Sequence, residues 1–334
     1  MRFTSRHVLR ASIAILAGTL ILTLTGSFVA AQAQISSKDT VSPDIALSNS
    51  WSSGTPMLTP RFGPAFGVIS GKAYVVGGAT SSAVVTTNEV YNPTTNAWAT
   101  RAPMPTATFA PAAAVVNGIL YVMGGSSNGS DQLSVVQAYN PSTNSWSIKS
   151  PMPIATSSMY AVAVKGIIYV VGGFANGGRT ANLLSYNPAT DSWKQLASMK
   201  VGKSTPATGL LGGIIVAGGL GNGGEVTDNE KYSPGTNKWK TLAPIPTARD
   251  AGCFGKISGK FYVAGGEQNN APLAVTEAYV ALTKSWTTSL ASMPQAVIGP
   301  ASAVHNSKLY CIGGANSGIF GQGVPYNNVQ IYQP

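Results

Sequence analysis

Three basic side chains stand at equivalent positions of a recurring sequence pattern. Arg61, Lys203 and Arg249 each follow a Met or Ile by four residues. If these positions converge in the folded chain, three cations would focus a positive potential there. Such a potential would favour an anionic ligand, for example an acidic sugar or a carboxylate-bearing peptide. A structural salt bridge at each position is the open alternative.

Two carboxyl groups are the candidates for proton transfer. Asp250 directly follows Arg249, and Glu267 follows a pair of glycines. A sugar-processing enzyme would need such a general acid and base, with Arg249 or Arg61 binding a substrate carboxylate. The chain has only 11 Asp and Glu among its 334 residues. This scarcity favours a binding protein over an enzyme, so we predict no catalytic residue.

A sequence repeat positions these side chains. The Trp residues recur at spacings of 46 to 48 residues: Trp51, Trp98, Trp146, Trp193, Trp239 and Trp286. A Gly-Gly pair and a Tyr seven residues before Trp recur in the same register. Repeats of this length are typical of solenoids and propellers.

One repeat unit predicts four short strands. Residues 108–116 and 119–123 flank Asn117-Gly118, a dipeptide typical of a tight hairpin turn. Residues 135–140 and 145–148 flank a second turn. The chain ends after a third strand, whereas Trp51 precedes the first complete unit. We therefore expect the N-terminal segment to supply the outer strand of the last unit, and Trp51 to be buried.

The unit resembles the kelch motif, with Gly-Gly, Tyr-Asn-Pro, a polar turn, Trp and Met-Pro, as in YNPTTNAW at 91–98. This resemblance implies an all-β, six-bladed β-propeller of four-stranded blades over residues 51–334, closed by an N-terminal outer strand. Kelch propellers include enzymes, scaffolds and ligand binders, so the fold does not specify the function.

Tight turns would occupy one face of such a propeller and longer, variable loops the other, where function usually lies. Phe174, Arg179 and Asn269 lie in these loops. With Arg61, Lys203, Arg249, Asp250 and Glu267, they form the predicted ligand-binding set. We predict an exported binding module for a glycan or a surface protein. The alternative is a sugar-acid epimerase or mutarotase resembling exported six-bladed kelch epimerases.

Several other classes of site are disfavoured, and we predict no metal and no cofactor. His305 is the one histidine beyond the N-terminal 33 residues, which excludes a copper site with paired histidines. The GxGxxG match at 219–224 precedes no helix pattern, which argues against dinucleotide binding. Basic residues are scattered rather than clustered, which argues against nucleic-acid binding.

The N-terminus resembles a secretory signal. Three arginines precede an apolar run over residues 11–30 and the small-residue site Ala31-Gln32-Ala33. We predict a signal peptide at 1–33, a polar linker at 34–50, no membrane span after cleavage, and a secreted or periplasmic protein. A retained anchor is the alternative. For Cys253 and Cys311 we favour buried free thiols, with a disulfide between adjacent blades as the alternative.

Overall fold

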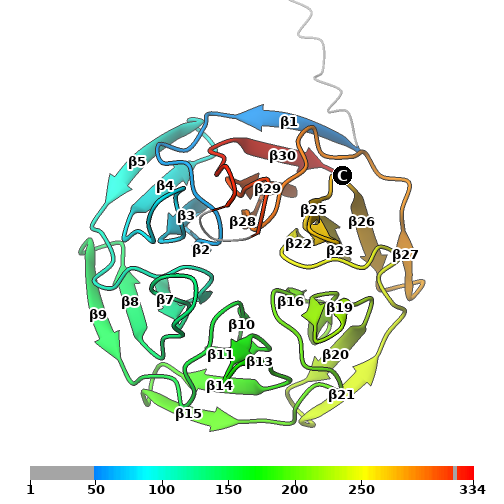
Figure 1. Cartoon of the computed structure of the whole chain (residues 1–334), viewed down its shortest axis with the longest axis horizontal. Coiled ribbons are helices and arrows are strands. Elements are labelled where there is room, and N and C mark those ends of the chain that lie inside the picture. The colour runs from blue at the N-terminus through cyan, green and yellow to red at the C-terminus, as the bar shows by residue number, and fades with distance from the viewer. Residues whose placement is uncertain (1–48, 319–321) are drawn as a thin grey trace, which may run out of the picture. The chain divides into compact units, whose positions relative to one another are not determined.

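Six four-stranded antiparallel sheets follow one another around a central axis as the blades of a β-propeller (Figure 1). The computed structural model describes residues 49–318 and 322–334. Every regular element within these residues is a β-strand, so none of them forms a helix long and apolar enough to cross a membrane. The predicted fold class is confirmed. The predicted signal peptide and nearly all of the linker lie outside the described residues.

The blades follow the chain in order. Blade one contains β2 (Ala65–Ile69), β3 (Lys72–Val76), β4 (Asn88–Asn92) and β5 (Ala97–Arg101). Blade two contains β6 (Ala112–Val116), β7 (Ile119–Met123), β8 (Val136–Asn140) and β9 (Ser145–Lys149). Blade three contains β10 (Tyr160–Val164), β11 (Ile167–Val171), β14 (Leu183–Asn187) and β15 (Ser192–Gln195). Blade four contains β16 (Ala207–Leu210), β17 (Ile214–Ala217), β20 (Asn229–Ser233) and β21 (Lys238–Thr241). Blade five contains β22 (Cys253–Ile257), β23 (Lys260–Ala264), β26 (Thr276–Val280) and β27 (Ser285–Thr287). Blade six contains β28 (Ala301–His305), β29 (Lys308–Ile312), β30 (Val329–Gln333) and β1 (Ser50–Gly54).

The second strand of each blade forms much of the core. In blade two, β7 reads ILYVM, and only its first residue is not fully buried. The glycines that follow, Gly124 and Gly125, have φ values of 62° and 91°, which glycine adopts without steric cost. A Cβ on Gly124 would lie 2.5 Å from the carbonyl oxygen of Thr156. The Gly pair therefore lets the entry segment of the next blade approach closely.

The first strand of blade two begins at Ala112 rather than at the predicted residue 108. Phe109 makes a single bridge to Ser126, and Ala110 has a φ of 51°. This left-handed residue interrupts the strand pattern. The apolar run from 108 therefore comprises a blade entry followed by a strand.

The two ends of the propeller chain close the ring, as predicted. Strand β1 pairs antiparallel with β30, with Trp51 opposite Tyr332, and Figure 1 shows the two strands side by side. The Tyr332 hydroxyl donates to Asn49 Oδ1 at 2.9 Å. Trp51 is half-buried rather than buried, because it lies on an outer strand. Its Nε1 donates to the Ala291 carbonyl of blade five at 2.9 Å.

A closed ring of backbone hydrogen bonds surrounds the axis. Each blade entry contains one residue with positive φ, and its N–H donates to the equivalent carbonyl of the preceding blade at 2.7–3.0 Å. The six residues are Gly63, Ala110, Ser158, Thr205, Ala251 and Gly299. Gly63 donates to Gly299 and so completes the circle. We call this the axial ring.

An outer set of contacts joins neighbouring blades at the rim. Each of the six repeat Trp residues donates from Nε1 to a carbonyl of the preceding blade at 2.7–3.1 Å. In blade two, Asn144 accepts from both the Tyr139 hydroxyl and the Ala102 N–H. The periodic Trp and Tyr residues thus have structural roles.

Cys253 and Cys311 form a disulfide, with their Cα atoms 5.7 Å apart. The preference for free thiols was therefore wrong. Cys253 begins β22 of blade five and Cys311 lies in β29 of blade six. Packing of the adjacent blades brings these two strands together. The bridge joins blade five to the blade that closes the ring.

We predict that replacing both cysteines with alanine destabilises the chain. The bridge spans a sequence separation of 58 residues. A cross-link of this length should contribute about 4 kcal/mol to the free energy of unfolding in the chain-entropy model. Denaturant titration of the double variant and the oxidised wild type measures the difference. Equal midpoints would contradict a structural role for the bridge.

We also predict that β1 is required for a soluble ring. A chain beginning at Met57 lacks β1 and exposes the edge of β30, and unpaired strand edges promote aggregation. Size-exclusion chromatography should show aggregates for this chain and a monodisperse species for one beginning at Ala46. Identical elution and stability of the two chains would refute the closing role of β1.

Candidate functional site

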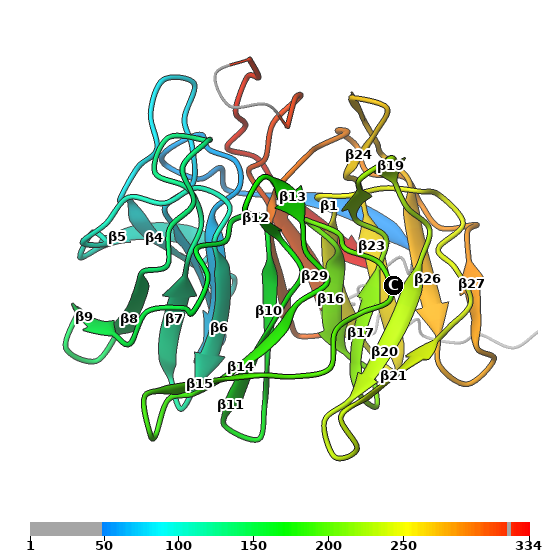
Figure 2. The same ribbon diagram turned by 60° about the horizontal axis from the view of Figure 1, so that its bottom comes forward.

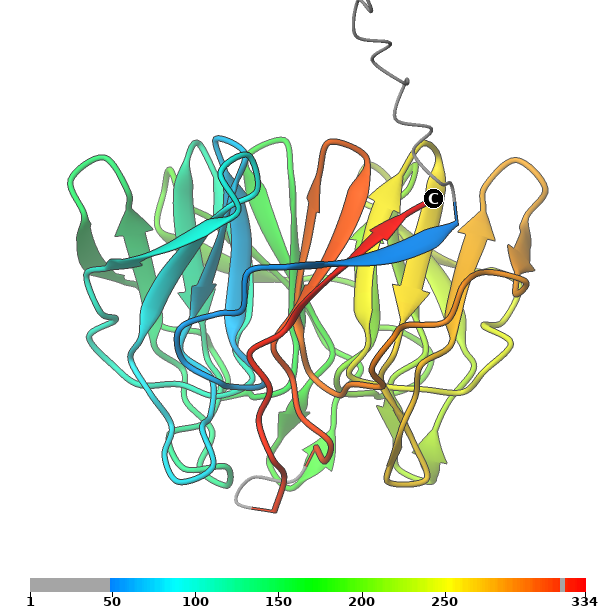
Figure 3. The same cartoon turned by 90° about the horizontal axis from the view of Figure 1, so that it is seen from above.

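The two faces of the propeller differ, as the repeat predicts. Tight turns lie along one edge of the blades and the longer loops along the other (Figure 3). Three of the longer loops contain short hairpins, which the sequence did not indicate (Figure 2). They are β12 (Phe174–Ala175) with β13 (Gly178–Arg179), β18 (Leu220–Gly221) with β19 (Gly224–Glu225), and β24 (Glu267–Gln268) with β25 (Ala271–Pro272).

A cavity of about 240 Å³ opens among the long loops at the axis. We call it the axial cavity. Its lining includes residues from the entry segments of all six blades and from several of the loops that follow the Gly pairs. All six residues of the axial ring line the cavity, because the ring fixes each entry segment beside the axis.

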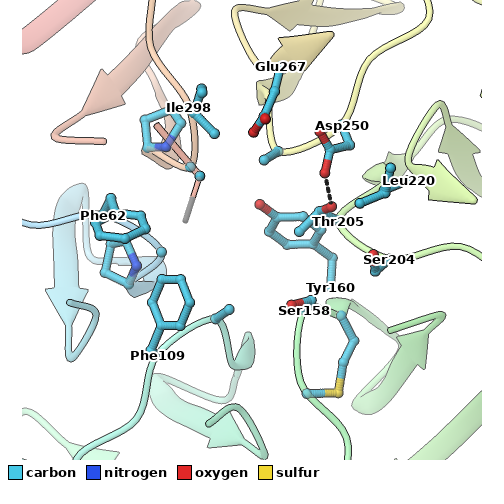
Figure 4. A pocket seen from close by; sticks show the side chains of 18 of the residues that line it. Phe62, Phe109, Ser158, Tyr160, Ser204, Thr205, Leu220, Asp250, Glu267 and Ile298 are labelled. Atoms are coloured by element: carbon cyan, nitrogen blue, oxygen red, sulfur yellow. Dashed lines mark hydrogen bonds between the residues drawn. The ribbon is translucent and has the colours of Figure 1, made fainter. Parts of the chain in front are cut away.

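The two walls of the axial cavity differ in chemistry (Figure 4). Phe62 and Phe109 form an apolar side, with their ring centroids 4.9 Å apart in an edge-to-face arrangement. Tyr160, Thr205 and Asp250 lie on the opposite side (Figure 4). The cavity therefore offers an aromatic surface facing a set of hydroxyl and carboxyl groups.

Asp250 and Glu267 lie opposite each other on adjacent backbone segments. The Asp250 N–H donates to the Glu267 carbonyl at 3.2 Å, and the Glu267 N–H donates to the Asp250 carbonyl at 3.0 Å. The Asp250 side chain is 8% exposed, and its Oδ2 accepts a 2.6 Å hydrogen bond from the Thr205 hydroxyl. Both carboxyl groups line the axial cavity, so the structure brings together the two predicted acid–base candidates.

Burial is the largest cause of the raised pKa values of the carboxyl and phenol groups in the cavity. It raises the pKa of Asp250 to about 7, with further increases from Glu267 and Glu225 and partial opposition from Thr205 and Arg179. Burial, followed by the charge of Glu225, also raises the pKa of Glu267. Burial and the charge of Asp250 raise the pKa of Tyr160, which stays protonated near neutrality. Raised carboxyl pKa values in a cavity are typical of functional sites.

The three entry cations do not form the expected positive funnel. Arg61, Lys203 and Arg249 are at most 2% exposed and do not line the axial cavity. Each pairs with a buried Glu of its own blade: Arg61–Glu89 at 3.0 Å, Lys203–Glu230 at 3.8 Å and Arg249–Glu277 at 2.6 Å. The salt-bridge alternative is therefore correct, and the argument for an anionic ligand from these residues is wrong.

The remaining predicted contacts lie around the cavity rather than in its lining. Phe174 and Arg179 pair across the β12–β13 hairpin, with the guanidinium 6.0 Å from the ring centroid. Asn269 is exposed in the β24–β25 turn, where its N–H donates to Glu225 Oε1 at 3.2 Å. Its neighbour Asn270 lines the cavity instead.

Sequence reasoning missed most of the lining residues. Phe62, Phe109 and Thr205 lie within the entry segments, and Tyr160 begins β10. The sequence does contain a signal for these residues, because the residue that precedes each axial-ring residue varies from blade to blade. The six residues at this position are Phe62, Phe109, Ser157, Ser204, Asp250 and Ile298. This variation at a fixed structural position is what distinguishes a site from a repeat.

Metal and dinucleotide sites find no support within the described residues. No cluster of three or more His, Cys, Asp or Glu side chains among them has the geometry to hold a metal ion. The GxGxxG match spans the β18–β19 hairpin, and no helix follows it. It therefore lacks the helix N-terminus that binds a pyrophosphate.

The chain belongs to the kelch-repeat family. The model described as "KLHDC2/KLHL20/DRC7 Kelch-repeats domain" matches residues 63–249. No curated protein matches the chain. A solved structure titled "Structure of YjhT" is similar with a TM-score of 0.72 and 19% sequence identity, over 82% of this chain and 95% of that one. At this identity the likeness shows the fold alone.

We predict that Arg249→Ala destabilises the propeller. It leaves the Glu277 carboxylate buried without its partner, which typically costs about 3–5 kcal/mol. The double variant Arg249→Met, Glu277→Gln removes both charges and should lose much less. Denaturant titration compares the two. If Arg249→Ala unfolded at the wild-type midpoint, the structural role of the ion pair would be refuted.

We predict that Asp250 makes stability depend on pH. Its pKa in the folded chain, about 7, lies above the ordinary value of 3.8, so the folded state binds the proton more tightly. The free energy of unfolding should therefore fall by about 3 kcal/mol as pH rises from about 4 to about 7. Asp250→Asn should lack this component, and Asp131→Asn, on an exposed loop, should retain it. Parallel pH profiles for wild type and Asp250→Asn would contradict the assignment.

Proposed function

We propose that this kelch propeller is a binding module whose axial cavity holds one unit of a glycan. The observation that carries this proposal is the division of the cavity into an aromatic side and a hydroxyl and carboxyl side (Figure 4). A sugar ring has C–H faces that can pack against aromatic rings and hydroxyl edges that hydrogen-bond to polar groups. The two sides of the cavity therefore match the apolar faces and the polar edges of a sugar ring.

The size and construction of the cavity support a small ligand unit. A volume of about 240 Å³ lies just below the roughly 300–1,000 Å³ of ligand pockets, which are mostly apolar with a few placed polar groups. The axial ring holds the lining in place before a ligand arrives, which reduces the entropy lost on binding. The rest of the glycan would extend over the long-loop face.

We propose that binding takes place outside the cytoplasm. The buried Cys253–Cys311 disulfide supports this, because disulfides persist mainly in oxidising compartments. The signal-like N-terminus points to the same location. N-terminal sequencing of exported material should then begin at Gln34, and recovery of the intact Met1 would contradict the proposed cleavage.

A glycan array tests the proposed function. Wild type should bind a subset of glycans, and Phe109→Ala and Asp250→Asn should each weaken that binding by about tenfold or more. Lys72→Ala, next to a tight turn on the opposite face, is the matched control and should bind as wild type does. Equal binding by all four folded proteins would overturn the proposal.

A sugar epimerase or mutarotase is the second candidate, and one observation favours it. Asp250, with a pKa of about 7, lies beside Glu267 in the cavity. A carboxyl group that titrates near neutrality suits general acid–base catalysis. A polarimetric mutarotation assay separates this candidate from simple binding, since only an enzyme would accelerate mutarotation in an Asp250-dependent way.

A further inference from the structure

We infer that the sugar unit held in the axial cavity carries a free, protonated amine, so that the ligand is an amino-sugar glycan. This inference rests on the proposed function and names the class of glycan.

The charge of the lining is the first observation. Asp250 and Glu267 both line the axial cavity, and the described lining contains no Lys, Arg or His. Asp250 is 8% exposed, and neither carboxyl group belongs to a salt bridge among the described residues. A bound ammonium would supply the counter-charge that this lining lacks.

The aromatic rings are the second observation. Phe62 and Phe109 border the cavity on one side and Tyr160 on the other (Figure 4). Contacts with Phe66 and Phe254, whose ring centroids lie 6.1 and 4.8 Å away, hold the Tyr160 ring in position. Aromatic faces attract cations, which partly offsets the hydration that an ammonium loses in the cavity. The rings and carboxyl groups thus favour the same kind of ligand.

The basic residues near the cavity do not offset this preference. Arg61, Lys203 and Arg249 are each engaged with a buried glutamate. Arg179 affects the titration of Asp250, but less than burial, Thr205, Glu267 and Glu225 do. An anionic unit would therefore meet two carboxyl groups in a lining whose described residues include no Lys, Arg or His. A neutral acetamide or hydroxyl would leave the carboxyl charge uncompensated.

Binding of an ammonium should be linked to proton release from the protein. The groups that act on Asp250 are Thr205, Glu267, Glu225 and Arg179, and Tyr160 is coupled to it by charge. An added cation favours the ionised form of a nearby carboxyl group. Because Asp250 titrates at about pH 7, an ammonium ligand should bind more tightly as pH rises from 6 to 8.

Isothermal titration calorimetry with three matched trisaccharides tests the inference. The β-1,4-linked trimers of glucosamine, N-acetylglucosamine and glucose share one backbone and differ at position 2, which bears an amine, an acetamide or a hydroxyl. We expect the glucosamine trimer to bind wild type at least about tenfold more tightly than the other two. Asp250→Asn and Glu267→Gln should each reduce that preference, and Asp131→Asn should keep it.

Propylamine is the probe for the pH dependence of binding. Its ammonium stays protonated between pH 6 and pH 8, as that of lysine does. Its affinity should rise about tenfold from pH 6 to pH 8, following the ionised fraction of Asp250, and stay flat in Asp250→Asn. A flat wild-type profile would contradict the role of Asp250.

The outcomes separate the inference from the proposed function. Equal affinity for all three trisaccharides would overturn the amine inference and leave the glycan proposal standing. Asp250-dependent binding of propylamine without any trisaccharide binding would show an ammonium site that accepts no amino-sugar trimer, and so would overturn the amino-sugar inference. Absence of binding by all four compounds would also overturn it, and in both cases the glycan array decides the glycan proposal separately.

Discussion

The axial ring is the constraint on which the rest of the structure depends. Its hydrogen bonds join each blade to the next and return from Gly63 to Gly299. Each member has a left-handed backbone, which turns the chain from the loop into the first strand. Non-glycine members such as Ala110 and Thr205 adopt this strained conformation, whose cost the surrounding structure must offset. The ring therefore fixes every entry segment at the axis, and it does so independently of the side chains of that segment.

The site results from variation on this fixed frame. The residue before each ring member bridges to a residue that follows the Gly pair. In blade one this bridge joins Phe62 to Ala79, and in blade five it joins Asp250 to Glu267. The same backbone geometry thus presents an aromatic ring on one side of the axis and two carboxyl groups on the other. A rigid scaffold with variable positions can change its ligand without changing its fold.

The fold was predictable because its signals are local and recur in register. Of the residues that line the site, only Asp250 and Glu267 were predicted, because the axis brings together side chains from different repeats. One structural feature was nonetheless present in the sequence. Glu89, Glu230 and Glu277 stand two residues before the repeat Tyr only in the blades that begin with Arg61, Lys203 or Arg249. Gln or Leu takes this place elsewhere. This pairing of charge across repeats indicates internal salt bridges rather than a ligand site. The disulfide could not be derived, because the spacing of two cysteines does not give the distance between blades.

A crystal structure of the chain with the glucosamine trimer bound is the most direct test of the account. We predict a sugar ring in the axial cavity, with its C–H face against Phe62 and Phe109 and its amine nitrogen within hydrogen-bonding distance of Asp250 or Glu267. A trimer bound on the tight-turn face, or one in the cavity with its amine directed away from both carboxyl groups, would contradict it.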